Sequence, residues 1–197
     1  MIHTFELPRE KLCAMSRFFE KAFEGGFMEA YTGTMHMADV SVELFRMFVT
    51  WVNNDQLAAC SVEDLVDLYA FADELDIPGL RTAITDELTA QCFDSGFDIP
   101  DLDLLEFMME TIPQAYPIHN LFAIAVARLL WHRPEKLGPL PYWFAIRVKK
   151  HLDKPYGICD ECCDEDCDSH DYCSHFWDQL SDYDPRRYHE TTNGTTD

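Results

Sequence analysis

The sequence predicts a mainly helical α+β fold with a small β-sheet, and three observations predict it. Apolar residues recur at helical spacing through most of residues 8–152. Two short segments, 1–7 and 34–40, instead alternate apolar with polar residues, as half-buried strands do. From Asp153 onward neither period continues, and the chain becomes acidic and rich in cysteine and histidine. We therefore expect three regions, at 1–92, 93–152 and 153–197.

Four helices are predicted in the first region. The first begins near Pro8 and ends at Gly25, which are residues that suit a helix start and a helix end. Ser41 and Ser61 are favourable N-caps for the second and third, and a break at Pro78 precedes the fourth. The stripes expected to form the core are Leu12, Met15, Phe19, Ala22 and Phe23; Leu44, Phe45, Phe48, Val49 and Val52; Leu65, Leu68, Tyr69, Ala72 and Leu75; and Leu80, Ala83, Ile84 and Leu88.

The second region is predicted to hold three more helices. Apolar residues from Leu102 to Ile112 indicate a helix that Pro113 closes. The segment 117–131 is apolar almost all round, so we expect that helix to be buried. The segment 140–152 predicts the last one.

The charge of the chain restricts the partners that it can bind. The formal net charge is −21, and a surface this acidic repels phosphate backbones, so we expect no nucleic-acid partner. The longest apolar run, from Leu121 to Ala127, is too short to span a membrane, and no secretory signal opens the chain. These features predict an intracellular protein, in the cytoplasm or the nucleus, whose cysteines are thiols or metal ligands.

Three blocks of the first region resemble a known family. The segment LVDLYAFADELDIPGLRTAITDEL, from Leu65 to Leu88, resembles the second helical pair of a BTB/POZ domain of the type common in fungal proteins. Upstream, KLCAMSRFFEKAFEGGFMEA from Lys11 and MHMADVSVELFRMFVTWV from Met35 are similar to two further blocks of the family, in the same order. Residues 95–150 resemble the helical extension that follows the domain in fungal members, and YHE at Tyr188 resembles a short motif near their C-terminus.

The resemblance implies a non-catalytic module that binds other proteins, with self-association left open. The sequence agrees, because it has no Gly-rich phosphate loop, nucleophile elbow or H-E-x-x-H motif. Cys13 and His3 could be read as a nucleophile and its base, but Cys13 lies beside an apolar stripe and is better explained as a packed thiol. We therefore predict no enzymatic activity.

Two departures from the family pattern concern its partners. The family usually has an extra strand before the segment equivalent to Phe5, and without it we expect no strand-exchanged dimer. Members that act as substrate adaptors for cullin-type ubiquitin ligases often carry an apolar-x-Glu motif, where this chain has Phe45-Arg46-Met47. Asn53-Asn54-Asp55 also replaces the family's Tyr-Thr-Gly. The adaptor role is the first alternative function, and these departures predict weak cullin binding.

A cysteine and histidine cluster in the third region raises the second alternative, a zinc-dependent regulator. Thiolate and imidazole ligands favour zinc, and C-x-x-C is a zinc-knuckle spacing. The ligands that we favour are Cys159, Cys162, Cys167 and His170, with Cys163, Cys173 and His175 as alternatives. The competing interpretation is an acidic tail whose cysteines bind nothing. The sequence leaves both open.

Overall fold

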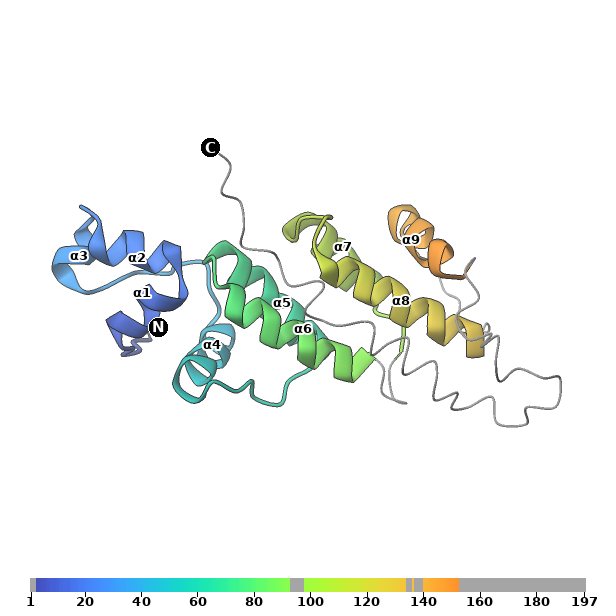
Figure 1. The fold of residues 1–197 in the computed structure, drawn as a ribbon, viewed down its shortest axis with the longest axis horizontal. Coiled ribbons are helices and arrows are strands. Elements are labelled where there is room, and N and C mark those ends of the chain that lie inside the picture. The colour runs from blue at the N-terminus through green and yellow to red at the C-terminus, as the bar shows by residue number, and fades with distance from the viewer. Residues whose placement is uncertain (1–2, 93–97, 134–135, 137–139, 153–197) are drawn as a thin grey trace. The chain divides into compact units, whose positions relative to one another are not determined.

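The computed structural model describes residues 3–92, 98–133, 136 and 140–152 (Figure 1). These residues form nine helices and no strand. The chain divides into two compact units, residues 1–90 and 91–197. In chain order the helices are α1 (Arg9–Met15), α2 (Arg17–Glu24), α3 (Met28–Thr32), α4 (Val42–Asn54), α5 (Val62–Glu74), α6 (Pro78–Cys92), α7 (Leu102–Thr111), α8 (Pro117–His132) and α9 (Tyr142–Leu152).

The predicted β-sheet is absent from the described residues. Residues 3–7 and 34–37 lack regular secondary structure, and 38–40 form a turn and bend. A strand needs a neighbour for its backbone groups, and neither segment makes a backbone-to-backbone hydrogen bond to another described residue. The alternation is nevertheless real, because Phe5, Leu7, Met35 and Met37 are half-buried between exposed neighbours. It therefore indicated burial on one side, and we misread it as pairing.

The helix predicted from Pro8 to Gly25 is two helices that meet at Ser16. This residue has extended backbone angles, φ −144° and ψ 123°, so it ends α1 and caps α2. The apolar stripe continues across the break, because Leu12, Phe19 and Phe23 are all buried. Periodicity alone did not reveal the interruption.

Aromatic rings fill the core of the first unit. Phe48 of α4 is fully buried and contacts the rings of Phe19, Phe45 and Phe71, with centroids 5.5–6.2 Å away. These rings bring α2 and α5 against α4. Of the residues expected to be buried together, Phe48, Leu68, Tyr69 and Leu80 are, whereas Phe45 is only half-buried.

Side-chain caps place the starts of several helices where the sequence predicted them. The Ser41 hydroxyl accepts from the backbone N–H of Leu44 at 3.1 Å. Ser61 and Asp64 form a reciprocal capping box at the start of α5, with bonds of 3.1 and 3.2 Å. Each cap satisfies backbone donors that the first helical turn leaves unpaired.

The second unit centres on α8. Its residues from Leu121 to Ala127 are all buried, as the apolar character all round this helix predicted. Helix α9 packs along α8, with Phe144 and Val148 buried. The ring of His151 hydrogen-bonds the side-chain oxygen of Asn120 at 2.9 Å, which links the end of α9 to α8.

Candidate protein-interaction surface

An exposed group of large apolar side chains lies on α2, on α3 and at the residue between them. We call it the apolar patch: Phe18, Phe27, Met28 and Tyr31, with exposed fractions of 39, 60, 70 and 81%. These four are half of the eight large apolar side chains exposed among the described residues. Exposed apolar residues gathered in this way mark contact sites for other molecules.

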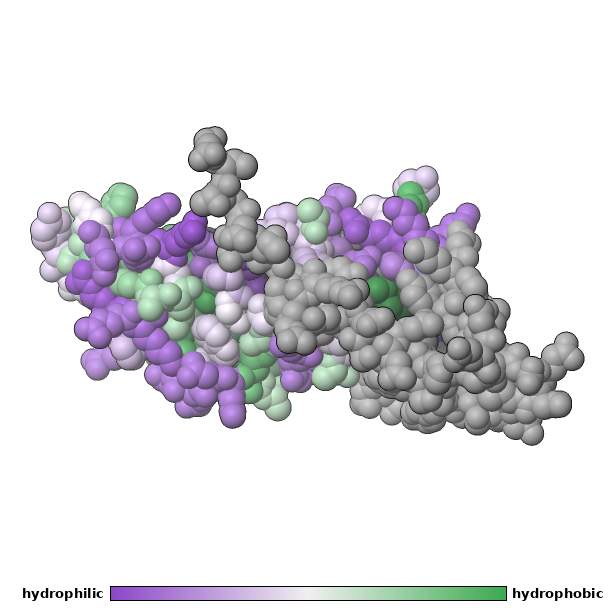
Figure 2. Space-filling model, in the orientation of Figure 1, coloured by the Kyte–Doolittle hydropathy of each residue, from purple (hydrophilic) through white to green (hydrophobic). Residues whose placement is uncertain are grey.

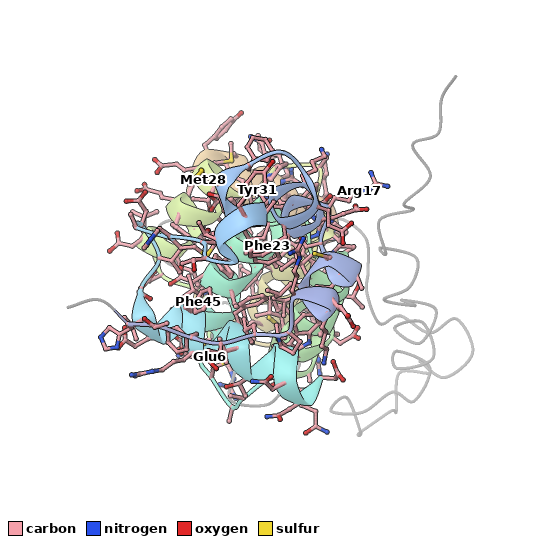
Figure 3. All side chains as sticks on the ribbon, turned by 90° about the vertical axis from the view of Figure 1, so that its left-hand side faces the viewer. Glu6, Arg17, Phe23, Met28, Tyr31 and Phe45 are labelled. Carbon is pink, nitrogen blue, oxygen red and sulfur yellow. The ribbon has the colours of Figure 1, made fainter. Side chains whose placement is uncertain are left out.

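The patch lies at one end of the first unit. Figure 2 shows apolar colouring among the polar residues at the α3 end of this unit. In the side-chain view, Met28 and Tyr31 project from α3 at the end facing the viewer (Figure 3). Helix α3 has no buried residue, so its apolar side chains contribute little to the core.

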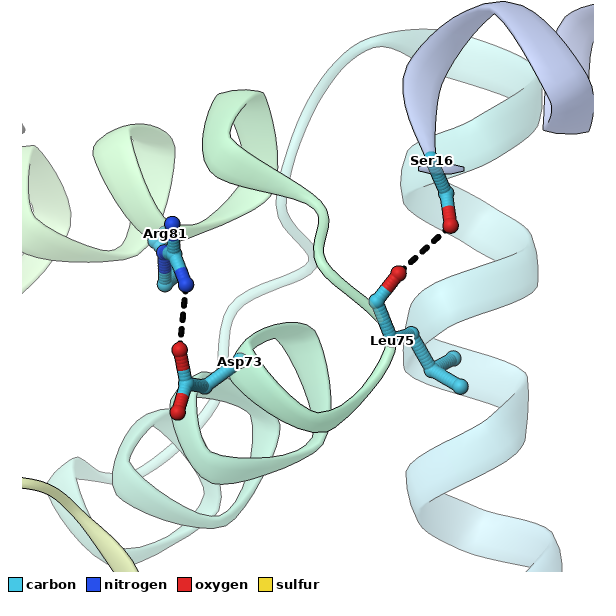
Figure 4. Close-up of polar contacts among 4 residues, drawn as sticks. All are labelled: Ser16, Asp73, Leu75 and Arg81. Carbon is cyan, nitrogen blue, oxygen red and sulfur yellow. Dashed lines mark hydrogen bonds and ion pairs between the residues drawn. The ribbon is translucent and has the colours of Figure 1, made fainter. Parts of the chain in front are cut away.

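Ser16 fixes the position of α2, the helix that carries Phe18 of the patch. Its hydroxyl oxygen accepts from the backbone N–H of Phe19 at 3.1 Å and donates to the backbone carbonyl of Leu75 (Figure 4). Ser16 is 2% exposed, so both bonds are shielded from water. One hydroxyl therefore starts α2 and ties it to the end of α5.

The chain beyond Leu75 is held in turn by a partly buried ion pair. The Arg81 guanidinium of α6 contacts the Asp73 carboxylate of α5, and Arg81 is only 8% exposed (Figure 4). This pair closes the α5–α6 turn, in which Asp76 has the left-handed φ of 49°. Ser16 bonds to Leu75 in this same turn, so the ion pair also helps to hold α2 in place.

The link from α2 to α3 depends on Gly25. A Cβ atom at this position would lie 2.3 Å from the carbonyl oxygen of Lys21, which is closer than real Cβ contacts come. Gly25 therefore allows α2 to end closely enough for the chain to turn into α3. Gly33, with φ 64°, ends α3 in the left-handed conformation that glycine adopts without cost.

Arg9, which belongs to α1, holds the end of α2 in place. Its guanidinium donates to the carbonyl oxygen of Phe23 and lies over the Phe23 ring, 5.9 Å from the centroid. Phe23 itself is buried and stacks with Phe19 at 6.1 Å. These contacts turn the inner face of α2 toward the core and leave Phe18 on its outer face.

Charged residues of both signs surround the patch. Arg17, Glu20, Lys21 and Glu24 are exposed on α2. An apolar centre with a charged, hydrated rim is the usual anatomy of a protein interface. The arrangement can hold the surface of another protein.

Two of the described cysteines, Cys60 and Cys92, are protonated thiols rather than nucleophiles. Burial raises the pKa of Cys92 to about 12. Burial, followed by the charges of Asp64 and Glu87, also raises the pKa of Cys60. Cys13 is half-buried, with its sulfur 3.8 Å from the carbonyl oxygen of Phe19. Protonated thiols are poor nucleophiles and poor metal ligands.

The predicted zinc ligands Cys159, Cys162, Cys167 and His170, and the alternatives Cys163, Cys173 and His175, lie outside the described residues. Within the described part of the chain, no three His, Cys, Asp or Glu side chains come together in a way that could hold a metal ion. The zinc site therefore stays a prediction.

A family comparison identifies the first unit. Residues 3–91 match the family model of the BTB/POZ domain. The chain thus contains a BTB/POZ domain over these residues, and such domains are generally non-catalytic modules for protein–protein interaction that often self-associate. No match was found among curated proteins or among solved structures. None of the described helices is long and apolar enough to cross a membrane.

Sequence reasoning missed the apolar patch itself. Phe18 has no place in the predicted stripe of Leu12, Met15, Phe19, Ala22 and Phe23, and this was a signal that its side chain faces outward. Phe27 and Met28 follow two glycines and belong to no stripe. Apolar residues left over after the stripes are assigned would have located the patch.

Proposed function

We propose that this protein is a non-catalytic binding module that contacts other proteins through the apolar patch of its BTB/POZ domain. The observation that carries the proposal is the exposure of Met28 and Tyr31, at 70 and 81%, on a helix that buries nothing. Keeping such side chains in water is unfavourable, and covering them with a partner removes that cost. The scaffold of α1 and α2 holds them in place before a partner arrives.

The finer features predicted from the sequence belong to this proposal. We infer that the domain is of the fungal type, that residues 93–152 form its helical extension, and that the protein acts inside the cell. Helices α7, α8 and α9 fall in that range and support the extension. The cullin-adaptor and zinc-regulator alternatives stay predictions.

Tyr31→Glu tests the proposal. A charge at Tyr31, the most exposed residue of the patch, should reduce binding of the natural partners about tenfold, because a few large contact residues supply most of the binding energy of an interface. The measurement is cross-linking of the full-length chain in cells, followed by quantitative mass spectrometry. The expected result is the loss of a defined set of partners with an unchanged melting temperature.

Tyr142→Glu is the matched control. Tyr142 is the same residue type with almost the same exposure, 82%, but belongs to α9 of the second unit. It should keep the partners that Tyr31→Glu loses. If Tyr31→Glu retains every partner at wild-type yield, the patch is not the contact surface.

A further inference from the structure

The segment from His3 to Leu7 has the side-chain arrangement of a sheet edge but no sheet. We call it the edge segment. Thr4 and Glu6 are exposed while Phe5 and Leu7 are half-buried, so the side chains of residues 4–7 alternate between two faces, and His3 before them is exposed. Figure 3 shows the stretch around Glu6 running across α4 without a helical turn.

Aromatic contacts anchor the edge segment on the core. The Phe5 ring lies 5.0 Å from the Phe45 ring of α4, which in turn lies 5.6 Å from Phe48 and 6.3 Å from Phe71. Phe45 is only half-buried, although it belongs to this aromatic cluster. One face of the edge segment is thus held by the helices, and apolar surface remains uncovered next to it.

The backbone N–H and C=O groups of the edge segment are available for further hydrogen bonds. Among the described residues, none of its N–H or C=O groups makes a backbone-to-backbone hydrogen bond. A row of such groups on a segment whose side chains alternate is a template for an added strand. Addition of a strand supplies main-chain hydrogen bonds for affinity and alternate side chains for specificity.

We propose that the edge segment binds an extended strand of a partner protein, which adds to it by main-chain hydrogen bonding. The inference rests on the proposed function, and it specifies the kind of partner. The partner strand should carry apolar residues at alternate positions, to cover the uncovered face of Phe45. Between them it should carry Lys or Arg, because the exposed side chains of the edge segment include the carboxylate of Glu6, and opposite charges across a strand pair are favourable.

Charge favours a different protein over a second copy of this chain. Two copies each carry a formal charge of −21 and repel one another, whereas a basic strand is attracted.

Selection from a displayed library of random linear 12-residue peptides, with the full-length protein as bait, tests the proposal. We expect enriched peptides that alternate apolar residues with Lys or Arg. On binding, backbone amides of residues 3–7 should exchange hydrogen more slowly, as read by mass spectrometry. A library that yields no binders, or binders that leave these amides unprotected, would overturn the proposal.

N-methylation of a selected peptide provides the matched comparison. Two versions are made, one methylated at the odd amides and one at the even amides. Successive amides of a strand point to opposite edges, so one version should lose at least about tenfold in affinity and the other should bind normally. Equal affinities of the two methylated peptides for the protein would contradict strand addition. If strand addition fails while Tyr31→Glu still loses partners, the proposed function stands without this inference.

Discussion

At the scale of the residue, Phe48 is enclosed by other aromatic rings in the core of the first unit. It is fully buried and three other rings pack against it from α2, α4 and α5. Its helical position predicted the burial, whereas the identity of the neighbouring rings depends on how three helices meet. Removing this ring should therefore affect the whole first unit.

Phe48→Ala should lower the free energy of unfolding by about 3–5 kcal/mol, from lost transfer energy and the cavity left behind. Chemical denaturation of the full-length protein measures the change. Phe18→Ala is the control, because Phe18 is 39% exposed and its truncation should cost less than about 1 kcal/mol. Equal denaturation midpoints for Phe48→Ala and the wild type would contradict the packing described above.

His119 is the second residue with an unusual environment. It is fully buried near the start of α8, and its Nε2 atom bonds the carbonyl oxygen of Ile112 at 3.0 Å. Its Nδ1 atom has no hydrogen-bond partner among the residues that the structure describes. The Trp143 ring lies edge-on to the His119 ring at 5.7 Å. Burial, and then the charge of Arg147, lowers the pKa of His119 below its ordinary value of 6.5. The neutral imidazole therefore suits the fold and the imidazolium does not.

This lowered pKa predicts a loss of stability in acid. The unfolded chain takes up a proton at His119 near pH 6.5 and the folded chain does not, so the free energy of unfolding falls as pH drops below about 6.5. It levels off below the lower pKa of the folded state. Hydrogen exchange of residues 112–132 in urea, measured between pH 4.5 and 7.5, reports the effect on the second unit.

His119→Gln is the control for acid sensitivity. Its amide can still donate to Ile112 and does not titrate, so the stability of the second unit should vary less with pH than in the wild type. A wild-type pH dependence in His119→Gln would assign the acid sensitivity to other groups.

At the scale of the element, local and long-range signals determine the helix boundaries differently. Three helices begin at a capping side chain that bonds a residue three positions away: Ser41 for α4, Ser61 for α5 and Asp101 for α7. These bonds are local, so the nearby sequence determines where the three helices start. Ser16 also bonds to Leu75, which is far away in the chain. The break between α1 and α2 is therefore supported by tertiary contact.

The close approach at Gly25 predicts a difference between two adjacent glycines. Gly25→Ala would place a Cβ atom 2.3 Å from the Lys21 carbonyl oxygen, whereas at Gly26 nothing lies within 4 Å. We expect Gly25→Ala to lower the free energy of unfolding by about 1–3 kcal/mol, since the backbone must shift. Gly26→Ala should be neutral or slightly stabilising.

Thermal unfolding of the two glycine variants measures this difference. Partner binding through the apolar patch should follow the same order, because Gly25 leads into the helix that carries Met28 and Tyr31. Two variants of equal stability would show that the end of α2 adapts without cost.

At the scale of the whole molecule, charge is unevenly distributed. Residues from His151 onward include 13 acidic and 3 basic side chains, whereas residues 1–150 include 23 acidic and 12 basic ones. The cysteine and histidine cluster lies in this acidic part. Negative potential attracts cations, so the acidic surroundings favour the zinc prediction.

Native mass spectrometry decides between zinc and a metal-free tail. The zinc interpretation predicts one ion per full-length chain, lost in Cys159→Ser and in Cys167→Ser because both supply thiolate ligands. Cys13→Ser is the control and should keep the ion, since Cys13 belongs to α1. A metal-free wild type after purification with added zinc would favour the acidic tail.

The sequence by itself determined those features that depend on neighbours a few positions apart. Apolar spacing and capping residues predicted the helices from Ser41 to Leu88 and the buried α8, because helical hydrogen bonds are local. Three short blocks in order were enough for the resemblance to the BTB/POZ domain, which the family comparison confirmed over residues 3–91.

Only the tertiary structure decided which apolar side chains have a partner. Phe19 and Phe18 look alike in the sequence, yet one is packed against Phe48 and the other is exposed on α2. The edge segment alternates as a strand does, but a sheet requires a second segment at hydrogen-bonding distance, and none among the described residues provides it. Periodicity shows which side of an element is apolar, whereas the contacts of the folded chain determine what covers it.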